Sequence, residues 1–188
     1  MGKISLEIDG KKISVPEGTK LLYACRKAGA EVPSLCDNYE LSSAGVCRIC
    51  MVEIERKGWK KLVASCSYIV EDGLKVVTKT PEIENIRKTI VQLLMPHAST
   101  GPLNELAVKY GIDDTPFRAP QTKCFYCGLC TRYCNEVKKA NVVYFKGRGT
   151  KREISLLSGG ALECLKCREC WELCPAGWIV VTAESAEV

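Results

Sequence analysis

The chain has 188 residues, of which 46% are hydrophobic and 26% charged, a composition typical of one medium or two small folded domains. Its 13 cysteines are too few, in so long a chain, for a disulfide scaffold. The net charge of +5 comes without a basic stripe of interleaved aromatic residues, so nucleic-acid binding is not expected. No run has the roughly 18 apolar residues of a membrane span, and the charged, alternating start does not resemble a signal peptide. We therefore expect a cytoplasmic protein with reduced thiols and no membrane span.

The N-terminal part has the pattern of a β-grasp fold. Residues 3–8 and 12–15 alternate apolar and polar side chains around an Asp-Gly turn, which predicts a hairpin. Residues 21–28 have a helical apolar face, with Thr19 as the expected N-cap and Gly29 as the stop. The runs "ICMVEIER" and "LKVVTKT" predict further strands.

Two helices and a linker are predicted before the cysteine-rich C-terminal part. Residues 81–95 begin with proline and carry acidic residues early and basic residues later, and Pro96 ends this helix. The run "LNELAVKYG" predicts a shorter helix with a glycine stop, and "DDTPFRAPQ" predicts a linker around residues 113–121. The predicted domains are residues 1–80, 81–112 and 120–188.

Four cysteines of the first domain have the spacing C-x10-C-x2-C-x15-C. They are Cys36, Cys47, Cys50 and Cys66. The C-x2-C pair puts two thiolates on one tight loop, and the other two come from separate segments. A [2Fe–2S] cluster needs such a mixture, because each iron takes two sulfurs on opposite sides of a flat core. Zinc sites also use C-x2-C pairs, so zinc remains an alternative from spacing alone.

The C-terminal part holds two copies of the spacing C-x2-C-x2-C-x3-C. In each copy three cysteines wrap one [4Fe–4S] cluster, and the fourth points at the other cluster. One predicted ligand set is Cys124, Cys127, Cys130 and Cys174. The other is Cys164, Cys167, Cys170 and Cys134. Three clusters with about −2 charge each would bring the net charge from +5 to about −1.

Three further side chains stand out near these motifs. Cys25 lies on the apolar face of the first predicted helix, so we expect a buried, inert thiol. Trp171 and Trp178 flank the last cysteines. They either limit water at a cluster and so lower its potential, or they pack in the core in the ordinary way.

The cysteine motifs carry a specific resemblance. "VPEGTKLLYACRKAGAEVPSLC" followed by "AGVCRICMVEI" resembles the [2Fe–2S] domain that opens the complex I large iron–sulfur subunit, iron-only hydrogenases and NAD-dependent formate dehydrogenase α subunits. The tract "NVVYFKGRGTKREISLLSGGALEC" resembles the insert between the two later motifs of that family. The resemblance covers roughly residues 3–182 and favours the cluster over zinc. It implies an α+β protein: a β-grasp [2Fe–2S] ferredoxin domain, a short helical connector and a bacterial-type 2[4Fe–4S] ferredoxin domain, without the family's catalytic domain.

The family also bears on His97, the one histidine of the chain. In members of that family, a histidine and three cysteines after the first connector helix hold an additional [4Fe–4S] cluster. Here Gly101 and Asn104 stand where the first two cysteines are expected. One imidazole cannot hold a cluster, so the resemblance implies that this cluster-binding region is degenerate here and keeps only its helices.

No catalytic constellation remains after these assignments. We find no nucleophile–histidine pair, phosphate loop or G-x-G-x-x-G after a strand, so no active site of its own is predicted. The expected function is electron transfer, as a subunit of a soluble multisubunit NAD(P)-linked oxidoreductase. Its expected partners are a flavoprotein subunit that handles NAD(H) or NADP(H) and a second catalytic subunit or ferredoxin, in a hetero-oligomer. An electron-bifurcating complex of anaerobic metabolism would fit. The alternatives are a free-standing polyferredoxin and a zinc-stabilised interaction module.

Overall fold

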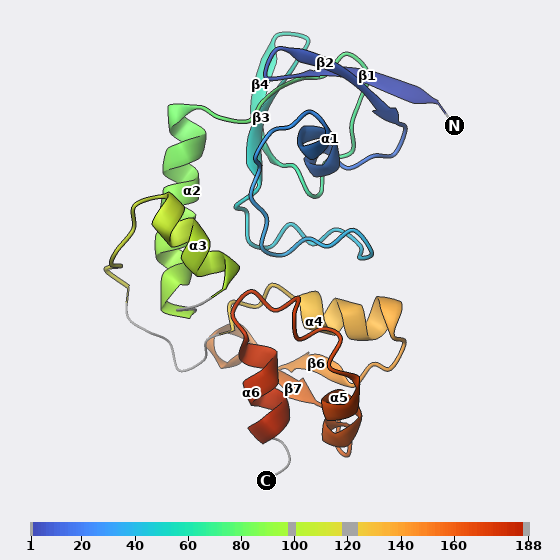
Figure 1. The fold of residues 1–188 in the computed structure, drawn as a ribbon, viewed down its shortest axis with the longest axis vertical. Helices are drawn as coiled ribbons and strands as arrows, with labels where there is room; N and C mark the ends of the chain where they lie inside the picture. Colours follow the sequence, from blue (N-terminus) through green and yellow to red (C-terminus); the bar gives the residue numbers. More distant parts are fainter. Residues whose placement is uncertain (1, 98–100, 118–123, 186–188) are drawn as a thin grey trace. The chain divides into compact units, whose positions relative to one another are not determined.

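The computed structural model describes residues 2–97, 101–117 and 124–185 (Figure 1). The chain divides into two compact units. The first contains Met1–Ser34 and Ser43–Ile90, and the second contains Leu35–Ser42 and Val91–Val188. Each unit is described in turn. Within the described ranges, no helix combines the length and apolar content needed to cross a bilayer.

The first unit is built on a five-stranded mixed sheet with the order β2-β1-β5-β3-β4. Its strands are β1 (Lys3–Ile8), β2 (Lys11–Pro16), β3 (Met51–Arg56), β4 (Trp59–Ala64) and β5 (Lys75–Val77). Two antiparallel hairpins, β1–β2 and β3–β4, are joined by β5, which pairs parallel to β1 and antiparallel to β3. Asp9 and Gly10 both have positive φ, at 49° and 80°, which a two-residue hairpin turn of this kind requires.

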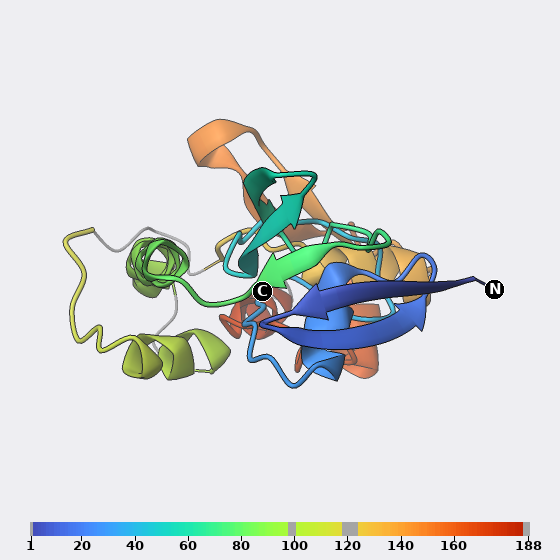
Figure 2. The same cartoon turned by 90° about the horizontal axis from the view of Figure 1, so that it is seen from above.

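Helix α1 (Leu21–Lys27) lies against one face of this sheet (Figures 1 and 2). Leu21 and Leu22 are fully buried in the same core as Ile8 and Val52, and each such side chain contributes about 1.5–3 kcal/mol on burial. The expectation that Thr19 caps this helix is wrong. The Thr19 hydroxyl donates to the Pro16 carbonyl at 2.6 Å instead.

The first N–H groups of α1 find their acceptors in the chain that follows β4. Leu21 N donates to the Tyr68 carbonyl at 2.7 Å, and Leu22 N donates to the Ser65 carbonyl at 3.0 Å. Backbone carbonyls therefore take the place of a capping side chain. These hydrogen bonds hold α1 against the turn that contains Cys66, one of the predicted cluster ligands.

Two helices follow the sheet along the chain. Helix α2 (Pro81–Leu94) starts after Thr80, whose hydroxyl accepts a hydrogen bond from Ile83 N at 3.1 Å. A single 3-10 turn, Met95–His97, comes next, and α3 (Pro102–Lys109) is the second helix. Both predicted helices are therefore present. The boundary between the two units falls inside α2, after Ile90.

The second unit consists of short elements around the later cysteines. They are α4 (Leu129–Arg132), a π-helical turn (Tyr133–Val137), β6 (Val143–Lys146), a 3-10 turn (Gly149–Lys151), β7 (Glu153–Leu156), α5 (Ala161–Cys167) and α6 (Trp178–Ser185). The strands form an antiparallel hairpin. The hairpin needs glycine at position 147, because a Cβ there would lie 2.2 Å from the Lys151 carbonyl oxygen. Together with the first unit, these elements make the predicted α+β fold.

Candidate metal centre

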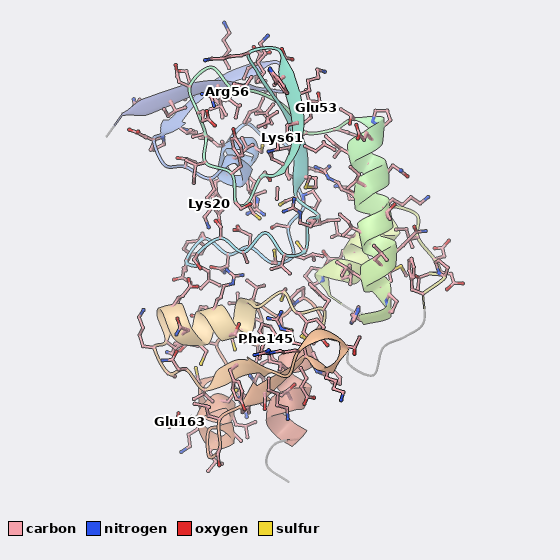
Figure 3. The ribbon with its side chains drawn as sticks, turned by 180° about the vertical axis from the view of Figure 1, so that it is seen from behind. Lys20, Glu53, Arg56, Lys61, Phe145 and Glu163 are labelled. Atoms are coloured by element: carbon pink, nitrogen blue, oxygen red, sulfur yellow. The ribbon has the colours of Figure 1, made fainter. Side chains whose placement is uncertain are left out.

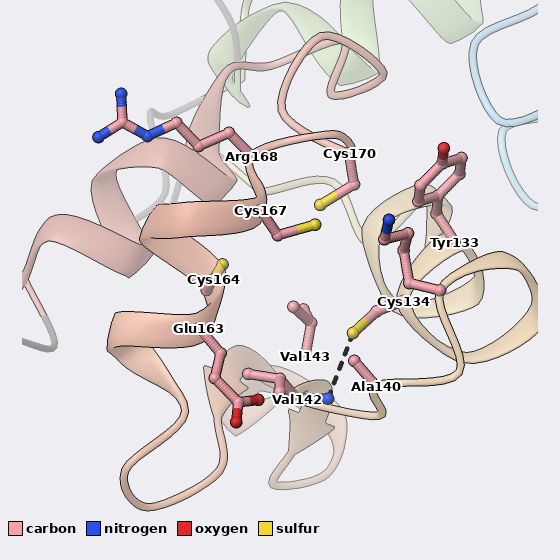
Figure 4. Close-up of a pocket in the computed structure, with 11 residues that line it drawn as sticks. Tyr133, Cys134, Ala140, Val142, Val143, Glu163, Cys164, Cys167, Arg168 and Cys170 are labelled. Atoms are coloured by element: carbon pink, nitrogen blue, oxygen red, sulfur yellow. Dashed lines mark hydrogen bonds between the residues drawn. The ribbon is translucent and has the colours of Figure 1, made fainter.

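Four cysteines from both C-terminal motifs line one pocket of the second unit (Figure 4). They are Cys134, Cys164, Cys167 and Cys170. Cys164 and Cys167 lie on α5, and Cys170 follows it, whereas Cys134 comes from the π-helical turn thirty residues earlier. The structure thus brings together the members of one ligand set predicted from the crossed motif. Val142 and Val143 form part of the apolar wall of this pocket.

The backbone around α5 explains how three cysteines of one motif reach the same pocket. Arg168 follows α5 in the left-handed conformation, with φ of 55°, and its N–H donates to the Cys164 carbonyl at 3.0 Å. This turn ends the helix and brings Cys170 back toward Cys164. From the opposite wall, the Cys134 sulfur accepts a hydrogen bond from Val142 N at 3.2 Å (Figure 4). Such N–H groups orient and stabilise a sulfur that binds iron.

The second predicted ligand set gathers around α4. Cys127 and Cys130 are buried, and burial raises the pKa of the Cys127 thiol to about 12. The thiol of Cys174 raises the pKa of Cys127, Cys130 and Cys124 further, which places Cys174 close to all three although it belongs to the other motif. Tyr126 N donates to the Cys124 sulfur at 3.4 Å.

The hairpin β6–β7 packs against this first motif. The ring of Phe145 (Figure 3) meets the ring of Tyr126 edge to face, with centroids 6.1 Å apart. The Arg152 guanidinium lies 4.1 Å from the Phe145 ring centroid and 5.9 Å from that of Tyr126. Tyr126 has positive φ of 58°, so its backbone is held in an uncommon conformation between two cysteines. The tract between the motifs therefore supports the geometry of the first one.

Crowded, buried thiols with raised pKa values need a cation before they can become thiolates. Metal binding displaces their protons and so contributes to folding. In the described part of the chain, no three Cys, His, Asp or Glu side chains meet at the spacing of a single metal ion. An iron–sulfur cluster does not require that spacing, because in a [4Fe–4S] cluster each thiolate binds a different iron. The residues present therefore fit two such clusters.

The N-terminal cysteines of the first unit lie in two neighbouring loops. Cys47 and Cys50 precede β3, Cys66 follows β4, and all three are buried. The Ser65 hydroxyl donates to the Cys50 carbonyl at 2.8 Å, and the Ser43 hydroxyl donates to the Cys66 carbonyl at 2.9 Å. These bonds hold the two loops against each other.

The fourth N-terminal cysteine, Cys36, belongs to the second unit with residues 35–42. The Arg132 guanidinium donates to the carbonyls of Cys36 and Ser42 at 2.7 and 2.5 Å. Glu136 accepts from Ser42 N and Oγ at 2.7 and 2.6 Å, and these bonds lower the pKa of its carboxyl. The Cys36 thiol is near enough to Cys127 to raise its pKa. The sequence analysis missed these contacts, because no local pattern links residues some 96 positions apart.

The remaining singled-out residues also have definite places. Cys25 is fully buried, as predicted, and burial raises its pKa to about 12. Trp171 and Trp178 are partly buried against the core formed with Cys134, Cys164 and Cys170. His97 ends the 3-10 turn after α2 and is half-buried. Residues 98–100 of the suspected degenerate region, and 118–121 of the linker, lie outside the described residues.

Comparisons with known proteins agree with this geometry. Residues 2–81 match the domain family described as 2Fe-2S iron-sulfur cluster binding domain, and residues 123–178 match the 4Fe-4S dicluster domain. The NADH-ubiquinone oxidoreductase 75 kDa subunit of Reclinomonas americana is 30% identical over 200 residues, covering 93% of this chain and 29% of that subunit. The NADP-reducing hydrogenase subunit HndD of Solidesulfovibrio fructosivorans is 30% identical over 218 residues, covering 96% and 36%.

A solved structure is also similar to this chain. A chain in the crystal structure of NAD+-reducing [NiFe]-hydrogenase in the H2-reduced state matches with a TM-score of 0.71 and 25% identity, over 81% of this chain and 74% of that chain. This chain spans only 29% and 36% of the two curated relatives. The chain therefore carries a [2Fe–2S] domain followed by a [4Fe–4S] dicluster domain, and it matches the N-terminal fragment of the NADH-quinone oxidoreductase 75 kDa/G and hydrogenase subunits.

Proposed function

We propose that this chain is an electron-transfer iron–sulfur subunit of a soluble, cytoplasmic, multisubunit NAD(P)-linked oxidoreductase. It relays electrons through one [2Fe–2S] and two [4Fe–4S] clusters. The observation that carries the proposal is the pocket that Cys134 shares with Cys164, Cys167 and Cys170 (Figure 4). Crossed ligation of this kind is a property of two-cluster ferredoxins.

The proposed ligands follow the two motifs and the N-terminal set. Cys36, Cys47, Cys50 and Cys66 hold the [2Fe–2S] cluster. Cys124, Cys127, Cys130 and Cys174 hold one [4Fe–4S] cluster, and Cys134, Cys164, Cys167 and Cys170 hold the other. When bound, each cluster accepts and passes on a single electron. The chain supplies the thiolates, the apolar wall at Val142 and Val143, and backbone N–H donors such as that of Val142 toward Cys134.

The proposed partners come from the chemistry that the relatives' names state. These names are NADH-ubiquinone oxidoreductase, NADP-reducing hydrogenase and NAD+-reducing hydrogenase. NAD(P)H gives up two electrons as a hydride, and a cluster takes one at a time. A flavoprotein subunit is therefore the natural partner between nicotinamide and this chain. A second catalytic subunit or a ferredoxin would take the electrons onward, and an anaerobic electron-bifurcating complex would fit this arrangement.

The proposal predicts an iron content. One [2Fe–2S] and two [4Fe–4S] clusters hold about ten iron atoms per chain. Anaerobic iron and sulfide analysis of the reconstituted chain should therefore give values near ten. A reproducible value near 14 would instead place a fourth cluster at His97. His97→Ala should leave the iron content and the paramagnetic resonance spectrum of the reduced protein unchanged.

A gentle anaerobic pull-down tests the partner assignment separately. A subunit should bring a flavin-containing protein with it in fixed ratio. Purification of the iron-loaded chain alone, with fast electron exchange to several carriers, would favour the free-standing polyferredoxin. A colourless preparation holding zinc would overturn both redox functions.

A further inference from the structure

The turn between β6 and β7 carries positive charge that nothing in the described residues neutralises. Four basic residues and one acidic residue lie within residues 144–153, and all five are exposed: Lys146, Arg148, Lys151, Arg152 and Glu153. Lys146 and Glu153 form an ion pair at 3.0 Å. No acidic side chain in the described part of the chain pairs with Arg148, Lys151 or Arg152. The turn therefore presents three positive charges to solvent.

These charges are local to the turn. Three bound clusters would bring the net charge of the chain from +5 to about −1, so the chain as a whole would not be basic. A basic segment on such a molecule attracts an anionic partner to one place on its surface and speeds association there. The turn is thus a candidate docking surface.

The backbone holds the turn in one conformation. Lys151 N donates to the Arg148 carbonyl at 3.1 Å, and Arg152 N donates to the Gly149 carbonyl at 3.2 Å. Gly147 and Gly149 have positive φ, at 73° and 54°. In Figure 2 the turn, drawn in orange, projects away from the helices of the second unit. A fixed, projecting backbone loses little conformational freedom when a partner binds.

A chain of contacts joins the turn to a cluster ligand. The Arg152 guanidinium lies 4.1 Å from the ring centroid of Phe145, which Figure 3 labels, and this ring meets that of Tyr126 edge to face. Tyr126 N in turn donates to the Cys124 sulfur at 3.4 Å, and Cys124 is half-buried. A protein bound at the turn would therefore lie near the first C-terminal motif. Electron transfer between proteins requires such an approach.

We propose that the β6–β7 turn docks an acidic electron-transfer protein beside the [4Fe–4S] cluster to which Cys124 belongs. Arg148 and Lys151 attract carboxylates of the partner, and Arg152 anchors the turn to the motif. The reduced cluster gives up one electron, and the flavin or iron–sulfur centre of the partner gains it. A nucleic acid would also take the positive charge, but it makes no use of a contact with a cluster ligand. This inference rests on the proposed function and names the charge of the partner.

The test is stopped-flow oxidation of the reduced, iron-loaded, full-length chain by flavodoxin, a small acidic flavoprotein, after removal of excess dithionite. One electron and one solvent proton convert its flavin to the neutral semiquinone, which absorbs red light. Arg148→Glu with Lys151→Glu should slow the second-order reaction at least roughly tenfold at low salt, because charge steering changes association rates by about 10–10³-fold. In about 1 M salt the Debye length falls to about 3 Å, so variant and wild type should react at the same rate.

A matched double variant separates the turn from the net charge. Lys57→Glu with Lys61→Glu makes the same change in net charge at another exposed hairpin, β3–β4, and should react with flavodoxin like the wild type. Basic cytochrome c should oxidise the turn variant faster than it oxidises the wild type. Iron content and the paramagnetic resonance spectrum should be the same in all three proteins. Equal slowing in both double variants, or in neither, would overturn the inference.

A measurement on the wild type covers the case in which the turn variant fails to hold iron. Carbodiimide coupling joins carboxylates of flavodoxin to lysine amines of the chain, and mass spectrometry should find Lys151 among the coupled lysines. Coupling that leaves out Lys151 contradicts the proposed docking. Binding of a short duplex DNA that the turn variant loses, with an unchanged flavodoxin rate, would make the turn a nucleic-acid surface instead. Absence of [4Fe–4S] signals in the wild type would refute the proposed function, whereas intact clusters with a charge-independent rate would refute the docking inference alone.

Discussion

Cys25 and Cys50 show that burial alone does not identify a ligand. Both side chains are fully buried in the core of the first unit, and Cys25 lies close enough to Cys50 for the latter to raise its pKa. Cys25 sits in α1, whereas Cys50 precedes β3 on the loop that also carries Cys47. We therefore expect Cys50 to bind iron and Cys25 to remain a free thiol, although both side chains are fully buried.

The Cys25 thiol should make stability depend on pH. Burial, followed by the nearby Asp9 carboxylate, raises its folded-state pKa to about 12, against about 8.5 in an unfolded chain. The folded thiol keeps its proton, so this stability is complete below pH 8.5 and is lost as the pH rises toward 12. Between pH 8.5 and 9.5 the wild type should lose about 1 kcal/mol more of its free energy of unfolding than Cys25→Ala. Urea unfolding followed by circular dichroism at both pH values measures the difference.

The matched variant Cys50→Ala provides the control for iron. Cys25→Ala should keep about ten iron atoms per chain, whereas Cys50→Ala should lose the [2Fe–2S] signal. Equal pH dependence in wild type and Cys25→Ala would show that this thiol ionises freely in the folded chain. Loss of iron from Cys25→Ala would make it a ligand, contrary to our assignment.

At the scale of elements, hydrogen bonds from the short helix α4 hold the loop of residues 35–42 in place. Residues 35–42 have no regular secondary structure. Within the second unit, Arg132 of α4 donates hydrogen bonds to the carbonyls of Cys36 and Ser42, near the two ends of this loop. Glu136 of the π-helical turn accepts hydrogen bonds from Ser42. Hydrogen bonds to charged groups contribute about 1.5–3 kcal/mol each when buried. Arg132 is only partly buried, so we expect about 1 kcal/mol in total from its two bonds.

Arg132→Ala should therefore loosen this loop without unfolding the unit. Amide hydrogen exchange of residues 36–42 should become roughly five- to tenfold faster, because about 1 kcal/mol corresponds to such a factor. Alkylation of Cys36 in metal-free protein should accelerate in parallel. Arg148→Ala removes an exposed arginine of the same unit and should leave both rates alone. Identical exchange in the two variants would mean that Arg132 does not hold the loop.

At the scale of the whole chain, the two units predict two different responses to ligand loss. Cys47 lies in the first unit and Cys174 in the second. Cys47→Ser should abolish the [2Fe–2S] signal and leave both [4Fe–4S] clusters in place. Cys174→Ser should damage the cluster of Cys124, Cys127 and Cys130, although Cys174 belongs to the other motif, and it should weaken the second unit because metal binding contributes to its folding.

Paramagnetic resonance of the reduced variants distinguishes these outcomes. Damage confined to the cluster of Cys164, Cys167 and Cys170 in Cys174→Ser would show that the ligation is not crossed. Loss of all three signals in Cys47→Ser would show that cluster binding in the two units is not independent.

The sequence by itself determined the elements and the chemistry of this protein. Alternation of side chains predicted the β1–β2 hairpin, and proline and glycine signals predicted α2 and α3, because these patterns act within one turn or one strand pair. The cysteine spacings predicted the pairing of Cys134 with the later motif, because ligand spacing in a cluster motif is itself a local geometric constraint. Thr19 was misassigned, since carbonyls more than 40 residues away took the place of the expected cap.

Only the tertiary structure decided which side chains and backbone groups surround the cysteine sulfurs. The hydrogen bond from Arg132 to Cys36 and the packing of Trp171 against the core that includes Cys164 are contacts between segments that lie apart in the sequence or turn sharply. They depend on how α4, α5 and the connecting loops pack, and packing is a property of the whole folded unit that no local pattern encodes. The cysteine spacing therefore predicts the type of each cluster, whereas the hydrogen bonds that reach the cysteine sulfurs are decided by the fold.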